Sequence, residues 1–252
     1  MYEALTDLSV ILTAAILGGM VNALAGGGSF LTLPALVFTG VSPVMANATG
    51  TAALLPGYLA SAWGSRDLIR APSGMTLRAI IVMGGIGGSI GASVLLLTSN
   101  DAFRIIVPWL LLFATVLFAV GPHIHKMFSA RFSQGGLLSG RVGVIAVSIY
   151  GGYFAGGMGI VMLAAFRLLG VHEINEANGL KNLLSAVLAG IGVLIYAAGG
   201  VISWPHVLPM GIAASVGGVG GAWLGRITPP GVLRASIVLV GAVTTILFFL
   251  DA

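Results

Sequence analysis

Apolar residues along this chain fall into ten segments, separated by short polar or glycine-rich stretches. The segments cover about residues 8–24, 29–40, 46–63, 77–97 and 102–120, then 141–154, 158–170, 178–198, 205–225 and 232–250. Several segments are long enough to cross about 30 Å of hydrocarbon, which takes about 20 helical residues. The pattern predicts an all-α polytopic membrane protein.

Three of the segments are too short to cross a membrane alone, and they border glycine clusters. Segments 29–40, 141–154 and 158–170 flank the clusters Gly26–Gly28 and Gly156–Gly159. Unwound backbone is tolerated at membrane depth only where it faces protein or a water-filled cavity. We therefore expect short broken or re-entrant helices at both clusters.

One offset of about 130 residues relates the two halves of the chain. It carries Ala25-Gly26-Gly27 onto Ala155-Gly156-Gly157, and Arg104 onto Arg234. A duplicated membrane unit interrupted by glycine is typical of many transporters. We interpret the chain as two copies of one unit.

Glycines spaced three or four apart recur in the fourth segment of each copy. They are Gly84, Gly87, Gly88, Gly91, Gly217, Gly221 and Gly225. A spacing of four places glycines on one helix face, where they allow close helix packing. They match no phosphate-binding pattern, so we interpret them as packing positions that hold the two halves together.

Composition indicates that the solvent of this chain is lipid. Hydrophobic residues make up 58% of the chain and charged residues 7%, against about 25% charged residues in an ordinary soluble domain. The lipid bilayer is therefore the expected partner. The net charge of +4 comes from a few loop residues and is no signal for nucleic acid. The absence of cysteine excludes disulfides and thiolate chemistry.

The placement of the basic residues predicts the topology. If all ten segments change sides, starting from an outer N-terminus, ten of the eleven Lys and Arg residues fall on the cytoplasmic side and only Arg104 falls outside. This positive-inside signal predicts a protein of the cytoplasmic membrane with both termini outside. With five segments per copy, the repeat at 141–252 is inverted relative to the repeat at 1–120, and a basic cytoplasmic linker at 121–140 joins them.

Polar residues inside the predicted spans are the candidate binding residues, because they are costly in a bilayer. They are Asn22, Ser29, Thr32, Asn47, Thr49 and Thr51 in the first copy, and Asn175, Asn178, Lys181, Asn182 and Ser185 in the second. Asn47 and Asn178 correspond if a one-residue gap is allowed. By the repeat symmetry, we expect both sets to meet near the membrane centre.

This arrangement favours a small anion as the solute. Broken helices expose backbone N–H groups at helix starts, where the helix dipole favours negative charge. Gly26–Ser29 and Gly156–Gly159 would each present such a nest of amides, and Lys181 is the one cation close to the polar set. Two simpler interpretations stay open: Asn47 and Asn178 cap helices, and Lys181 extends to the cytoplasmic face.

Two blocks of the chain resemble a known family. Residues Gly18–Gly57, which read GGMVNALAGGGSFLTLPALVFTGVSPVMANATGTAALLPG, resemble the first conserved block of the TauE/SafE sulfite-exporter family of permeases. Residues Gly151–Ser185, which read GGYFAGGMGIVMLAAFRLLGVHEINEANGLKNLLS, resemble its second block. One departure is Gly50, which follows Thr49 where relatives often carry Asn or Ser.

The resemblance implies a permease for a small sulfur-containing anion, such as sulfite or an organosulfonate like sulfoacetate. It carries the family's motif positions onto Asn22, Gly26, Gly27, Gly28, Pro34, Asn47 and Thr49, and onto Gly156, Gly157, Gly159, Asn178, Lys181 and Asn182.

The function expected from these observations is export of this anion by alternating access. The alternatives are a passive anion channel and a permease for another small organic acid. We expect no enzyme, cofactor or metal site, because the histidines His123, His125, His172 and His206 all fall in or beside predicted loops. All seven acidic residues lie near segment ends, which favours transport driven by the membrane potential over proton coupling. A homo-oligomer is compatible with the sequence.

Overall fold

The computed structural model describes residues 2–72, 74–131, 137–171, 173–227 and 229–251, which form ten α-helices, one short 3-10 helix and no strand. The helices are α1 (Tyr2–Ala25), α2 (Ser29–Phe38), α3 (Pro43–Gly64), η1 (Arg66–Leu68), α4 (Leu77–Leu97), α5 (Asn100–Arg131), α6 (Leu137–Tyr153), α7 (Met158–Leu168), α8 (Ile174–Ala198), α9 (Trp204–Ile227) and α10 (Pro230–Asp251). Each α-helix corresponds to one of the ten predicted segments, so the all-α fold class is confirmed. The largest difference is α5, which continues to Arg131, inside the stretch expected to be a linker.

Two short helices follow breaks at the glycine clusters. The first break separates α1 from α2, and Gly26 there has φ 75°. The second break separates α6 from α7, and Gly157 there has φ 69°. With 10 and 11 residues, α2 and α7 are each about 15 Å long, half the thickness of the hydrocarbon core.

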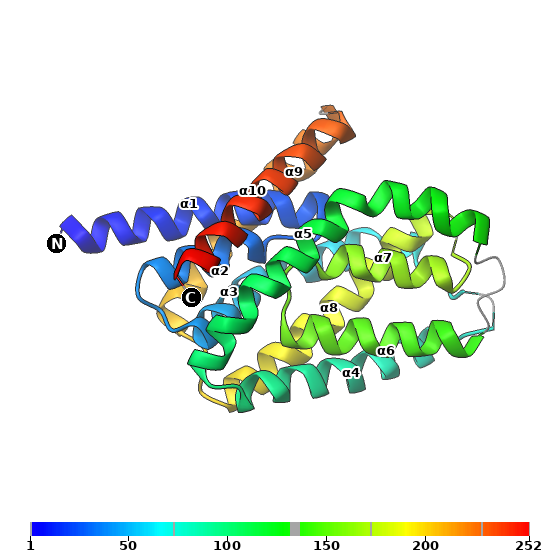
Figure 1. Cartoon of the computed structure of the whole chain (residues 1–252), viewed down its shortest axis with the longest axis horizontal. Coiled ribbons are helices and arrows are strands. Elements are labelled where there is room, and N and C mark those ends of the chain that lie inside the picture. Colours follow the sequence, from blue (N-terminus) through cyan, green and yellow to red (C-terminus); the bar gives the residue numbers. More distant parts are fainter. Residues whose placement is uncertain (1, 73, 132–136, 172, 228, 252) are drawn as a thin grey trace.

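Helices at equivalent positions of the two halves run in opposite directions in Figure 1. This holds for α1 and α6, for α4 and α9, and for α5 and α10. One end of the bundle therefore holds the last residues of α3, α5 and α7 and the first residues of α4, α6 and α8. Arg66, Arg70, Arg78 and Arg141 lie at that end, whereas Arg104 lies at the other end, near the start of α5.

Helices of one half pack directly on helices of the other half. Helix α4 lies along α6, where a Cβ added at Gly87 would come 2.7 Å from Cβ of Ser148. Helix α9 lies along α1 in the same way, because a Cβ added at Gly217 would overlap the backbone of Ile16. These glycines belong to the spaced series in the sequence, and their missing side chains allow the two halves to approach.

The centre of the bundle is formed by α3 and α8. Every residue of α3 from Ala46 to Leu54 is buried, so this helix has no lipid-facing side along that stretch. The two helices are antiparallel: a Cβ added at Gly179, near the start of α8, would lie 2.9 Å from the carbonyl carbon of Leu68, just past the end of α3. An ion pair of 3.5 Å between Arg70 and Glu176 joins the same two regions.

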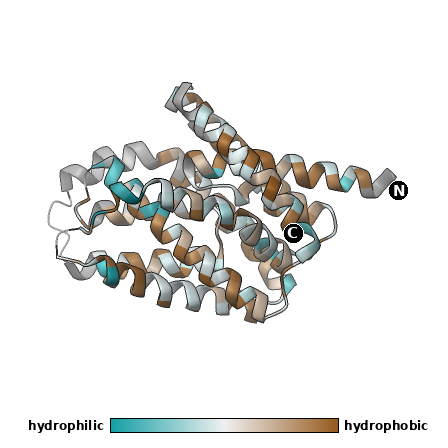
Figure 2. Cartoon of the chain, turned by 180° about the vertical axis from the view of Figure 1, so that it is seen from behind, coloured by the Kyte–Doolittle hydropathy of each residue, from teal (hydrophilic) through white to brown (hydrophobic). Residues whose placement is uncertain are grey.

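The outer surface is apolar. Figure 2 shows hydrophobic residues throughout the helices. Leu97, Val219 and Leu250 are at least three-quarters exposed. Within the described residues, four helical stretches are long and apolar enough to cross a membrane. They are Leu5–Leu24, Leu77–Leu97, Asn100–Leu117 and Asn175–Ala198.

Candidate functional site

The two helix breaks meet inside the bundle. A Cβ added at Gly26 would lie 3.3 Å from Cα of Gly159, the second residue of α7. A Cβ added at Gly157 would lie 2.6 Å from Cβ of Ala114 in α5 and 3.5 Å from the ring of Phe30 in α2. The N-termini of α2 and α7 are therefore neighbours. We call this place the junction and define it as residues 26–29 and 156–159.

The first break carries hydrogen-bond donors that no described residue satisfies. The side chain of Asn22 is 8% exposed and makes no hydrogen bond to a described residue: its buried Oδ1 is an acceptor without a partner there, and its Nδ2 is the donor; its Cβ lies beside Gly28. The Oγ of Ser29 is buried and also has no partner among the described residues. No backbone hydrogen bond from the amides of Gly27, Gly28 and Ser29 reaches a described residue. Buried polar groups without partners are rare, so this cluster is a candidate ligand contact.

The second break has its carbonyl groups satisfied by side chains from three helices. The hydroxyl of Tyr150 donates to the Gly156 carbonyl at 2.6 Å. Asn47 Nδ2, from α3, donates to the Tyr153 carbonyl at 3.1 Å. The hydroxyl of Tyr196, from α8, donates to the Gly152 carbonyl. The last carbonyl groups of a helix lack intrahelical partners. These donors therefore fix the C-terminal end of α6 and set where α7 begins.

The predicted polar residues of α3 have structural partners. Thr49 Oγ1 accepts the backbone N–H of Ser203 at 3.0 Å and ties α3 to the turn before α9. Thr51 Oγ1 donates to the Asn47 carbonyl at 2.8 Å within the same helix. Asn47 Nδ2 donates to the Tyr153 carbonyl of α6, and its buried Oδ1 has no partner in the described part of the chain.

The predicted polar residues of α8 lie away from Asn47. Asn182 Nδ2 donates to Ser65 Oγ at 3.1 Å and lies 3.4 Å from the Ser61 carbonyl oxygen, near the end of α3. Ser61 is about 21 Å along α3 from Asn47 at 1.5 Å per residue. The expectation that both polar sets meet at the membrane centre is therefore wrong for Asn47 and Asn182. Because α3 and α8 are antiparallel, equivalent positions on them lie toward opposite ends of the pair.

The side chains of Lys181 and Asn178 have no hydrogen bond or ion pair with a described residue. Lys181 is buried at 7% exposure. It lies one helical turn from Ser185, whose Oγ contacts Met162 Sδ at 3.6 Å, so Lys181 is on the side of α8 that faces α7. Of the sequence-predicted site, the structure thus brings together the two glycine clusters, Asn22, Ser29 and Asn47, and it leaves the α8 residues toward the other end.

The tyrosines of the site are missing from the sequence-based prediction. Tyr150 and Tyr196 hold the second break, and Tyr58 has a buried hydroxyl without a partner among the described residues. A tyrosine inside an apolar segment is a usable signal, because a buried Tyr hydroxyl normally finds a hydrogen-bond partner.

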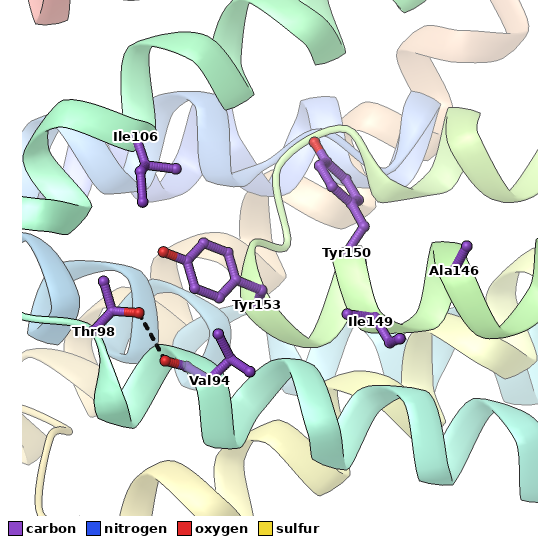
Figure 3. A pocket seen from close by; sticks show the side chains of 7 residues that line it. All are labelled: Val94, Thr98, Ile106, Ala146, Ile149, Tyr150 and Tyr153. Atoms are coloured by element: carbon purple, nitrogen blue, oxygen red, sulfur yellow. Dashed lines mark hydrogen bonds between the residues drawn. The ribbon is translucent and has the colours of Figure 1, made fainter.

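A pocket of about 470 Å³ lies beside the second break, between α4, α5 and α6. It is lined by Val94, Thr98, Ile106, Ala146, Ile149, Tyr150 and Tyr153. Figure 3 shows the ring of Tyr153 pointing between Thr98 and Ile106, and the hydroxyl of Tyr150 pointing toward the turn that follows α6. This mostly hydrocarbon lining does not suit an anion. No group of three metal-ligating side chains occurs in the described ranges.

Comparison with known proteins defines the class. The chain is 28% identical to the "Probable membrane transporter protein YfcA" of Escherichia coli (strain K12) over 97% of its own length and 90% of that protein. It is 30% identical to a "Probable membrane transporter protein" of Haemophilus influenzae, over 86% of this chain and 83% of that one. Together with the apolar helical bundle, these relatives identify a multi-pass membrane transporter.

Residues 11–248 match the family described as Sulfite exporter TauE/SafE. The chain therefore belongs to the TauE/SafE family, as the two motif blocks indicated. No solved structure matches the chain.

Proposed function

We propose that this transporter exports a small sulfur-containing oxyanion, such as sulfite or an organosulfonate, and binds it at the junction. The observation that carries the proposal is the approach of Gly26 to Gly159, which brings the N-termini of two short helices together. Each N-terminus has the equivalent of about half a positive charge and free amide donors. The printed name of the family, a sulfite exporter, supports the choice of solute.

The proposed roles follow from position. Solute contacts come from Asn22, Gly26, Gly27, Gly28, Ser29, Gly156, Gly157 and Gly159. Asn47, Thr49 and Thr51 support the site from α3, because their hydrogen bonds hold the second break and the turn before α9 in place. Asn178, Lys181 and Asn182 form the approach from the end of the bundle where α8 begins, and the charge of Lys181 attracts anions to it.

The two halves act as an inverted repeat that alternates between two states. The opposite directions of equivalent helices support this, as does an asymmetry between equivalent side chains. The side chain of Asn47 donates to the Tyr153 carbonyl at the end of α6, whereas the side chain of its counterpart Asn178 makes no hydrogen bond with a described residue. In a transporter with two related gates, one gate is closed while the other is open.

The membrane potential drives export in this proposal, with the Arg-rich end of the bundle in the cytoplasm and both termini outside. A potential of about 100 mV is worth about 2.3 kcal/mol for each elementary charge that crosses. This corresponds to a concentration ratio of about 50 for an anion of one charge.

The test is flux of labelled sulfite in proteoliposomes that hold the purified chain, with and without an imposed potential. We expect efflux of sulfite to accelerate when the interior is negative and to slow when it is positive. Liposomes without protein control for leak. If protein-dependent flux does not change with the potential, the membrane potential is not the driving force. If no protein-dependent flux of sulfite or organosulfonate occurs, the proposed function is wrong.

A further inference from the structure

We propose that the junction accepts oxyanions of one negative charge and rejects those of two, so that bisulfite and organosulfonates are carried while sulfate and the sulfite dianion are not. This rests on the proposed function and specifies the substrate class of the same site.

The donors at the junction are all electrically neutral. They are the amides at the start of α2, the N-terminus of α7, the Nδ2 of Asn22 and the buried hydroxyl of Ser29, which has no partner among the described residues. The charged residues on the helices that form the junction are Glu3, Asp7, Arg141 and Arg167, all toward helix ends away from the breaks. No formally charged side chain is therefore built into the donor set.

The charge that these donors supply matches a monoanion. Two helix N-termini, each equivalent to about +0.5 elementary charge, together offset about one negative charge. Removing an ion from water costs free energy that grows as the square of its charge, whereas its attraction to fixed dipoles grows only in proportion. A dianion would therefore incur about four times the desolvation cost for about twice the attraction.

Among the side chains whose burial the structure describes, Lys181 is the one that is charged and buried, and it lies outside this donor set. It is on α8, one turn beyond Ser185, which contacts Met162 of α7. On α7, Gly159 lies three residues before Met162, nearly one turn closer to the break. From Met162, Gly159 and Lys181 therefore lie in opposite directions. Lys181 therefore acts on the approach of the solute and does not compensate a second charge at the junction.

The experiment compares three solutes in proteoliposomes that contain the purified full chain. Methanesulfonate is a monoanion and sulfate a dianion across the neutral range, and sulfite changes from bisulfite to the dianion as pH rises. We expect methanesulfonate flux that does not depend on pH, no sulfate flux above the leak of empty liposomes, and sulfite flux that falls about tenfold for each pH unit above the bisulfite pKa. The methanesulfonate series controls for any effect of pH on the protein.

The outcomes separate this inference from the function on which it rests. Sulfate flux, or sulfite flux that holds constant or rises with pH while methanesulfonate flux stays level, would overturn the monoanion rule and leave the oxyanion transporter intact. Absence of flux for all three solutes would instead overturn the proposed function, and the present inference with it.

Substitutions test which residues are responsible for the preference for monoanions. Lys181→Met should slow entry of every solute and leave the order of preference unchanged, so a gain of dianion transport in this variant would assign the selection to Lys181. Ser29→Ala should reduce methanesulfonate flux by roughly tenfold, as expected for one lost hydrogen bond to a charged group. Thr115→Val is the matched control, because Thr115 also has a buried hydroxyl without a described partner but faces Gly241 of α10. Equal flux in the Ser29→Ala and Thr115→Val proteins would remove Ser29 from the site.

Discussion

Replacing Gly26 by alanine tests whether the contact between the two breaks matters for transport. Gly26 has φ 75°, and its added Cβ would lie 3.3 Å from Cα and 3.6 Å from the amide nitrogen of Gly159. Gly170 offers a matched control: it has φ 81°, and a Cβ there would meet nothing within 4 Å. Both substitutions place alanine in the same left-handed backbone conformation. Only the added Cβ of Gly26→Ala would contact the other break, at Gly159.

The expected magnitudes differ for this reason. A left-handed conformation costs a residue with a side chain about 1–2 kcal/mol, so both variants should lose that much free energy of unfolding. At Gly26 the new carbon is a few tenths of an ångström inside ordinary contact distance, and such overpacking typically adds about 1–3 kcal/mol. The Gly159 amide would also shift relative to the solute. A misfit that removes about 1.4 kcal/mol of binding lowers affinity tenfold.

The assay pairs thermal denaturation in detergent with sulfite flux in liposomes, and flux is divided by the amount of folded protein. We expect Gly170→Ala to transport at the wild-type rate despite its lower stability, and Gly26→Ala to lose about tenfold or more. Equal flux per folded molecule in the two variants would refute the reasoning that the junction of the breaks is the binding site.

Other side chains of the site give further predictions. Asn47→Ala should lower the free energy of unfolding by about 1–3 kcal/mol, because the Tyr153 carbonyl loses its donor, whereas Asn178→Ala should change it by less than about 0.5 kcal/mol. Both variants should abolish flux, and wild-type flux in both would remove these residues from the mechanism. Tyr150→Phe should cost about 1 kcal/mol through its lost bond to the second break. Tyr58→Phe should cost nothing, since its hydroxyl has no described partner, and thermal denaturation of the two proteins distinguishes these outcomes.

The helices and their breaks were predictable from the sequence because both are local properties. Apolar runs define where a helix can lie in lipid, and the runs around 29–40 and 158–170 closely match α2 and α7. The glycines at positions 26 and 157 have positive φ in the structure, as expected where a chain must turn sharply. The spaced glycines on α4 and α9 also identified surfaces that pack closely, although the partner helices were not predictable.

The use of each polar side chain was not predictable in the same way. Asn47 and Asn182 look alike in the sequence, yet Asn47 caps the end of α6 while Asn182 bonds Ser65. The tyrosine donors to the second break were overlooked, since Tyr150 lies within an apolar run whose pattern indicates only burial.

By itself, then, the amino-acid sequence determined the solvent of this protein, its ten helices and the two breaks, because each of these depends on composition and on neighbours within a few turns. Only the tertiary structure decided that the breaks touch at Gly26 and Gly159 and that the polar positions of α3 and α8 lie apart. Those outcomes depend on which helices pack together and in which direction, and contacts between distant segments leave no periodic trace along the chain.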